Sequence, residues 1–292
     1  MDFTLSDEQA AMVAAMRSLL ARECPTSLVR AHMTDRSAHE SLWSHLSSWT
    51  EVSRTSVVDT CLVLVELGAV CAPGPFLADA LAAPVTRYDA LGTLALAGSL
   101  VPDVDLVERV LFADGRVVDA SSVTARPVDV VDSSRRLFDV DGAERGEGDL
   151  ATRAYVLVAA ELMGTVRTLL EMTVSYARER VQFDRPIGSF QAVQHKLADV
   201  ALDRERAEAA VFYAAMCVDA GDPDAARAAH VAKAAAGVAA RRAAKDAVQI
   251  HGGIGFTWEH DLHLFIRRAY TSEFLAGSSK WHHDRLGEML FA

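Results

Sequence analysis

Five residues in the C-terminal half could bind a nucleotide, three through their side chains and two because they are glycines. Arg180 follows a long helical pattern, so its guanidinium can pair with a pyrophosphate. Phe183 offers an apolar face to an adenine or flavin ring, and Gln249 can bond the polar edge of a ligand. Gly252 and Gly253 lack side chains, so their backbone N–H groups can approach a phosphate. Together these residue types predict a site for the phosphate and ring portions of a nucleotide.

The same residues also have purely structural interpretations. Arg180 could be a solvated cation that complements the dipole at the end of its helix. Gly252 and Gly253 could simply end the preceding helix. Taken one at a time these positions favour the structural interpretation, so the case for a ligand depends on their combination.

Long helices must position these residues. Apolar periodicity and alanine-rich composition predict helices over 151–178, 190–220, 223–250 and 261–275, with a last helix after Ser278. Asp222 is suited to cap the third of them, with Pro223 in its first turn. Several long helices with short connections predict a C-terminal four-helix bundle over residues 149–292.

The N-terminal part, residues 1–104, also has a helical pattern. Ser6 and Gln9 have the spacing of a capping box, and Pro25 ends the helix that follows. Further helices are predicted over 42–49 and 56–69, with a weaker helical stretch over 76–97. Residues 105–148 contain short β-like runs and a polar, glycine-rich linker, too small for a domain with a good core of its own. We therefore expect a mainly α protein with a strongly reduced middle β-segment.

Composition narrows the classes of function. The chain has 292 residues, 51% of them hydrophobic, and a formal net charge of −11, which argues against nucleic acid as a partner. Its four cysteines form no CxxC, and no His/Cys spacing indicates a metal site. No apolar run is long enough to span a membrane, and the first residues do not have the pattern of a signal peptide. These features predict a cytoplasmic protein with reduced thiols.

Two strings carry a resemblance to the acyl-CoA dehydrogenase family. The first is YARERVQFDRPIGSFQ, residues 176–191, and the second is QIHGGIGF, residues 249–256. They lie in the order and at the separation found in that family, and LG at 67–68 followed by APGPF at 72–76 resembles its N-terminal helical domain. The resemblance covers both ends of the chain and the middle only poorly. It implies that FAD is the cofactor, and that its ADP half is contacted across a subunit interface by Arg180, Gln182, Phe183, Gln249, Gly252 and Gly253.

The glutamate that this family uses as its catalytic base has no counterpart at the matching positions. An ungapped count from Gly252 brings the base position onto Ala276, and the alternative position on an earlier helix falls on Ala154. A methyl group cannot accept the Cα proton of an acyl-CoA. Glu273 is a weak candidate for a shifted base, although we expect it to be a solvated helix charge.

The middle segment also lacks the family's Thr-Glu-Pro and Gly-Ser-Asp motifs, whose loops hold the flavin ring. The retained parts are those that the family donates in trans. The chain therefore resembles the short, base-less subunit of heterotetrameric actinobacterial acyl-CoA dehydrogenases of the steroid side-chain type. The resemblance implies an acyl-CoA substrate, a full-length dehydrogenase partner subunit and electron-transfer flavoprotein as the acceptor.

Two other functions fit the sequence. The chain could be a stand-alone enzyme of altered chemistry, with Glu273, His251 or His260 as the acid/base. It could also be a flavin-free helical interaction protein. The fold alone does not choose among the three.

Overall fold

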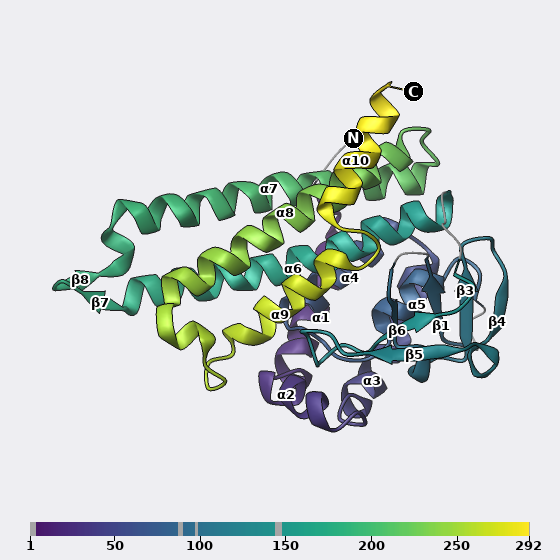
Figure 1. Cartoon of the computed structure of the whole chain (residues 1–292), viewed down its shortest axis with the longest axis horizontal. Coiled ribbons are helices and arrows are strands. Elements are labelled where there is room, and N and C mark those ends of the chain that lie inside the picture. The colour runs from purple at the N-terminus through teal and green to yellow at the C-terminus, as the bar shows by residue number, and fades with distance from the viewer. Residues whose placement is uncertain (1–3, 87–89, 97–98, 144–147, 292) are drawn as a thin grey trace.

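The computed structural model describes residues 4–86, 90–96, 99–143 and 148–291, and it is mainly helical as predicted (Figure 1). The N-terminal helices are α1 (Asp7–Glu23), α2 (Thr26–Thr34), α3 (Glu40–Leu46), the 3₁₀ helix η1 (Ser47–Arg54), α4 (Val57–Ala69) and α5 (Phe76–Ala82). The predicted capping box is confirmed. Ser6 Oγ accepts from the backbone N–H of Gln9 at 3.2 Å, and Gln9 Oε1 accepts from the backbone N–H of Ser6 at 3.1 Å.

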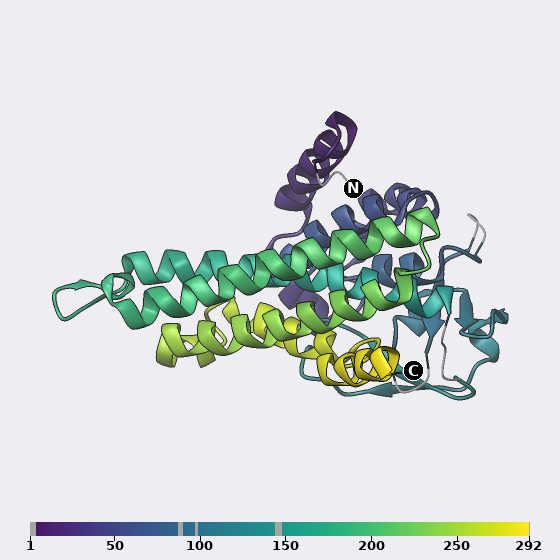
Figure 2. The same cartoon turned by 90° about the horizontal axis from the view of Figure 1, so that it is seen from above.

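The long helices lie side by side along the length of the molecule (Figures 1 and 2). They are α6 (Asp149–Glu179), α7 (Gln191–Ala220), α8 (Ala225–His251) and α9 (Leu262–Phe274), followed by α10 (Ser279–Phe291). Alanine lines the buried face of α8, which allows the helices to approach closely. Helices α4 and α6 cross closely, since a Cβ added at Gly164 would lie 1.9 Å from the carbonyl oxygen of Val65. Glycine is therefore required at that crossing.

The middle of the chain forms two small three-stranded sheets. Their strands are β1 (Gly92–Ala95), β2 (Val101–Pro102), β3 (Arg109–Phe112), β4 (Val117–Asp119), β5 (Ala125–Val128) and β6 (Leu137–Val140), with 3₁₀ turns η2 (Val104–Leu106) and η3 (Ala120–Ser122). The first sheet has the order β1-β3-β4 with β1 parallel to β3, and the second has the antiparallel order β2-β6-β5. They enclose a small apolar cluster of their own: Ala95, Val101, Val104, Val110, Phe112, Phe138 and Val140.

Three local predictions were wrong. The weak helical stretch over 76–97 is helical only to Ala82, and Gly92–Ala95 is strand β1, so the β-rich part begins before residue 105. Residues 26–34 form α2, which the sequence pattern did not indicate. Finally, α8 begins at Ala225 rather than beside Pro223, and the Asp222 carboxylate instead accepts from the backbone N–H of Asp224 at 2.8 Å.

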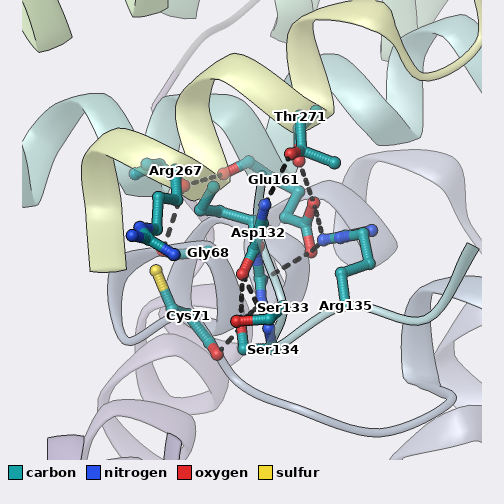
Figure 3. A network of polar contacts seen from close by, with 12 residues as sticks. Gly68, Cys71, Asp132, Ser133, Ser134, Arg135, Glu161, Arg267 and Thr271 are labelled. Carbon is teal, nitrogen blue, oxygen red and sulfur yellow. Dashed lines mark hydrogen bonds and ion pairs between the residues drawn. The ribbon is translucent and has the colours of Figure 1, made fainter. Parts of the chain in front are cut away.

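A buried polar junction joins the three parts of the chain (Figure 3). Its centre is Arg268 of α9, whose Nε donates to Asp132 of the β5–β6 connection at 2.6 Å. Arg268 Nη2 also donates to the carbonyl of Cys71, which follows α4, at 3.2 Å. Glu161 of α6 is 3.6 Å from Arg268 Nη1 and accepts from Arg135. Burial raises the pKa of Asp132, but Arg268 and Ser134 outweigh it and the pKa is lowered, so this carboxylate is charged.

Candidate functional site

The first predicted ligand-binding string forms the end of α6 and a short hairpin. Arg180 is the C-cap of α6, and its backbone N–H donates to the carbonyl of Tyr176 at 2.8 Å. Strands β7 (Val181–Gln182) and β8 (Arg185–Pro186) then form the hairpin, which projects beyond the helices (Figure 1). Phe183 lies at its tip with φ +53° and with 87% of its surface exposed. An exposed phenylalanine at a left-handed position gains nothing from its own chain's core, so it is available to something outside the chain.

The second string ends α8. Gln249 is exposed two residues before the end of the helix. Gly252 has φ +63° and its backbone N–H donates to the carbonyl of Val248, and the 3₁₀ helix η5 (Gly252–Phe256) follows. A Cβ at Gly252 or Gly253 would meet no atom within 4 Å. The positive φ explains why residue 252 is glycine. Packing within this chain does not require glycine at 252 or at 253.

Tyr176 and His251 bring these two segments together. The two rings stack with centroids 4.3 Å apart, and the Tyr176 hydroxyl donates to the carbonyl of His251 at 3.3 Å. Arg180 lies one turn after Tyr176, and Gly252 directly follows His251. We call this region the distal end of the bundle: the hairpin at 181–186 with Arg180, and the end of α8 with Gln249, Gly252 and Gly253.

The distal end carries cations although the whole chain is acidic. Arg178, Arg180 and Arg185 are exposed there, and the Arg185 guanidinium lies 4.1 Å from the centre of the Phe190 ring. Within the described residues, no carboxylate forms an ion pair with Arg178 or Arg180. The Arg180 guanidinium therefore has its hydrogen-bond donors free for an anion.

The other predicted site is the α9–α10 turn, residues 275–278. Ala276 is buried and has φ +57°, which is uncommon for a residue other than glycine. Its N–H donates to Ser99 Oγ at 2.8 Å, and its carbonyl lies 3.0 Å from His282 Nε2. The polar groups of the turn are thus satisfied from within the chain.

Glu273 is not the solvated helix charge that we expected. Its side chain is fully buried against α8 and α10, and Oε1 accepts from the N–H and the hydroxyl of Ser279 at 2.9 and 2.7 Å. Sequence periodicity missed this because the burial comes from α8. There, Gly237 leaves room for the carboxylate: a Cβ at 237 would lie 3.3 Å from Glu273 Oε1.

An apolar cleft of about 430 Å³ opens beside the same turn, on the other side of α9. Its lining consists of Leu100, Asp129, Val130, Val131, Leu137, Tyr270, Thr271, Phe274 and Leu275. Glu273 does not line this cleft. Asp129 does line it, but Asp129 is exposed. A base for a weakly acidic C–H needs a dry carboxylate at the reacting carbon, whereas Asp129 is exposed and Glu273 does not line the cleft.

The remaining acid/base candidates make contacts within this chain. Ala154, the alternative base position, is buried inside α6. The next residue, Tyr155, packs against His230 and His282. His251 is buried, its Nδ1 donates to the carbonyl of Ala247 at 2.8 Å, and its pKa is lowered by burial. His260 Nδ1 accepts from the backbone N–H of Leu262 at 3.1 Å.

Three further features concern metal binding, membrane spans and thiols. Among the residues with described positions, no group of three or more His, Cys, Asp or Glu side chains is arranged to hold a metal ion. No described helix combines the length and apolarity needed to cross a bilayer. Cys24, Cys61, Cys71 and Cys217 are free and buried.

Comparison with known proteins yields close relatives over nearly the whole chain. A family model described as acyl-CoA dehydrogenase, C-terminal domain, matches residues 152–291. The acyl-CoA dehydrogenase IpdE2 of Mycobacterium tuberculosis is 32% identical over 311 residues, covering 95% of this chain and 95% of that protein. IpdE2 of Mycolicibacterium smegmatis is 32% identical over 319 residues, covering 98% of this chain and 100% of that protein.

Solved structures share the fold at lower sequence identity. The ChsE4–ChsE5 complex from Mycobacterium tuberculosis contains a chain that matches with a TM-score of 0.81 and 23% identity, over 100% of this chain and 99% of that one. A chain of the Tcur3481–Tcur3483 steroid ACAD matches with a TM-score of 0.86 and 23% identity, over 99% of both chains. The first of these structures is a complex, and the second carries the names of two proteins.

Proposed function

We propose, from the premise that this chain belongs to the acyl-CoA dehydrogenase family, that it is the base-less subunit of a heteromeric, FAD-dependent enzyme. The reaction would be the α,β-dehydrogenation of an acyl-CoA thioester. The chain would contribute contacts to the ADP half of FAD, while a partner subunit supplies the catalytic base. The observation that carries the proposal is the contrast between an open distal end and a closed α9–α10 turn.

The distal end fits the ADP half of FAD. A pyrophosphate needs donors without competing carboxylates, and the exposed Arg180 provides them. Gly253 and Gly252 leave open space around their backbone, so a phosphate oxygen can come close. Phe183 presents its ring to the outside, where an adenine could stack, and Gln249 adds an amide. FAD supplies the hydride acceptor when it is bound.

The α9–α10 turn supports the division of labour between subunits. Ala276 has no group that takes a proton, and its backbone is engaged by Ser99 and His282. Glu273 points toward Ser279 rather than into the apolar cleft. Removal of the Cα proton therefore needs a carboxylate from another chain.

The partner and the substrate class follow from the relatives. Two structurally similar chains come from structures that carry the names of two proteins, and one of these is a steroid enzyme. We infer a full-length acyl-CoA dehydrogenase as the partner, in a heterotetramer, and a bulky acyl-CoA such as a steroid-derived one as the substrate. Electron-transfer flavoprotein is the inferred electron acceptor, and the inferred location is the cytoplasm.

Flavin content tests this proposal. We expect the chain purified alone to be colourless and inactive with saturated acyl-CoAs and a dye acceptor. Co-expression with a full-length dehydrogenase encoded beside it should give a yellow, active complex with equal numbers of the two chains. Activity of the pure single chain would contradict the proposal and favour a stand-alone enzyme. A complex that stays colourless would favour a flavin-free interaction protein.

A further inference from the structure

One face of α8 holds the end of α9 and the start of α10 through buried polar groups. Lys233 is fully buried, and its ammonium donates to the carbonyls of Glu273 at 2.8 Å and Gly277 at 2.7 Å. Gly237, one turn later, leaves room for the Glu273 carboxylate. Arg241, a further turn on, has its Nε 3.9 Å from that carboxylate. The face thus fixes both the α9–α10 turn and, through Ser279, the first turn of α10.

A pair of buried histidines connects α8 to α10 beside this cluster. His230 Nδ1 and His282 Nδ1 are 2.7 Å apart, and His282 Nε2 is 3.0 Å from the carbonyl oxygen of Ala276. A carbonyl can only accept, so Nε2 of His282 carries a proton. With His282 neutral, its Nδ1 has a lone pair, and His230 Nδ1–H donates into it. A single proton lies between the two Nδ1 atoms, so the contact is lost if both rings carry a proton there.

We propose that α8, α9 and α10 form a proton-sensitive latch, in which the neutral His230–His282 pair keeps α10 and the α9–α10 turn seated on α8 and acidification releases them. A proton added to the pair introduces positive charge in a buried site beside Lys233, and because burial lowers the pKa of Lys233 to about 7, acidification charges this amine as well. Glu273 is the carboxylate that faces this cluster, and it already lies near both Lys233 and Arg241. Added charge therefore lies beside two cationic side chains that already face this carboxylate.

The groups around the pair include charged and titratable side chains from three helices. From α8 these are His230 and Lys233, from α10 His283, and from α6 the ring of Tyr155. The pKa of His282 is lowered to about 2, mainly by burial and then by Lys233, His230 and His283, although the hydrogen bond to the Ala276 carbonyl raises it. A histidine with a lowered pKa in the closed state stabilises that state above its ordinary pKa of 6.5. This stabilisation is lost progressively as the pH falls below that value.

Release of α10 would change the surface that the chain presents. The helix carries Trp281 close to the histidine pair, and Met289, Leu290 and Phe291 at its exposed end. It extends away from the body of the molecule (Figure 1). The latch would therefore make the orientation of an apolar helix end depend on pH.

Hydrogen exchange of the full chain tests the latch. The protection of α10 amides, relative to amides of α7, should fall on the order of tenfold from about pH 7.5 to about pH 5, after correction for intrinsic exchange. His282→Gln retains an N–H donor for the Ala276 carbonyl but does not titrate, so its α10 protection should not depend on pH. His283→Gln, which alters the exposed neighbouring histidine, should behave as wild type.

Two outcomes would overturn the latch. One is equal relative protection of α10 at both pH values in the wild-type protein. The other is an undiminished pH-dependent loss in His282→Gln. If that variant does not fold, His282→Asn takes its place, because it also removes the ring that titrates and makes the same prediction.

Discussion

The distal end of the bundle and the α9–α10 turn lie on the same long helices, but they differ in what satisfies their polar groups. At the distal end, Arg180 and Gln249 are exposed, and Gly252 and Gly253 have open space around them. At the turn, Ser99, Lys233 and His282 occupy the backbone groups from within the chain. A region left open is suited to a ligand or partner outside the chain, whereas a region closed on itself contributes structure. In this chain the half that we propose contacts the nucleotide stays open, and the half with the position that matches the family's base is closed.

The largest expected effect of a substitution lies in the buried polar junction, which belongs to the closed part of the molecule. Arg268→Leu should lower the free energy of unfolding by about 3–5 kcal/mol, because it leaves Asp132 charged and buried without its partner. Urea denaturation measures this.

Arg267→Leu is the matched control, at the neighbouring position. Arg267 is partly exposed and its guanidinium lies 4.2 Å from the centre of the Trp258 ring. Its loss should cost only about 0.5–1 kcal/mol. Equal costs at the two positions would show that the junction does not hold the three parts of the chain together.

A smaller effect is expected where helices cross. Gly164→Ala should destabilise the chain by about 1–3 kcal/mol, because its Cβ would overlap the carbonyl of Val65 and the backbone must shift. Thermal or urea unfolding of the isolated chain measures the change. A neutral result would mean that α4 and α6 can separate without loss.

The smallest effect on stability is expected for a glycine at the distal end. Gly253→Ala should change the free energy of unfolding by no more than about 0.5 kcal/mol, since its Cβ would meet no atom within 4 Å. The same substitution should weaken flavin retention in the complex with the partner, because a methyl group blocks close approach of a phosphate. A variant that is destabilised as strongly as Gly164→Ala would remove the contrast between the two regions.

The sequence predicts best what local patterns determine. The long helices were located to within a few residues because alanine-rich periodicity, the Ser6–Gln9 capping box and glycine ends are local signals. Strand β1 was missed because its partner β3 lies further along the chain, with Gly92 paired to Arg109, and its own residues have no strand signal. The family resemblance inferred from the two strings is confirmed by relatives that match over nearly the whole chain.

For the candidate site, the sequence indicated which residues could contact a ligand but not what closes the turn. Arg180, Phe183 and Gln249 are exposed as a ligand site requires. The burial of Glu273 depends on Gly237 and Lys233 of α8, which are remote in sequence. No periodicity within α9 reports on that contact. The roles of the distal residues toward FAD stay predictions.

The most direct test of the central claim is FAD affinity in the complex with a full-length partner, compared between wild type, Arg180→Ala and Arg178→Ala. Arg178 is an equally exposed cation two residues earlier, so its loss controls for net charge. If Arg180 contacts the pyrophosphate, Arg180→Ala should weaken FAD binding by about 1.5–3 kcal/mol, and Arg178→Ala by much less. Equal FAD affinity in wild type and Arg180→Ala would contradict the account that this chain completes a flavin site held by its partner.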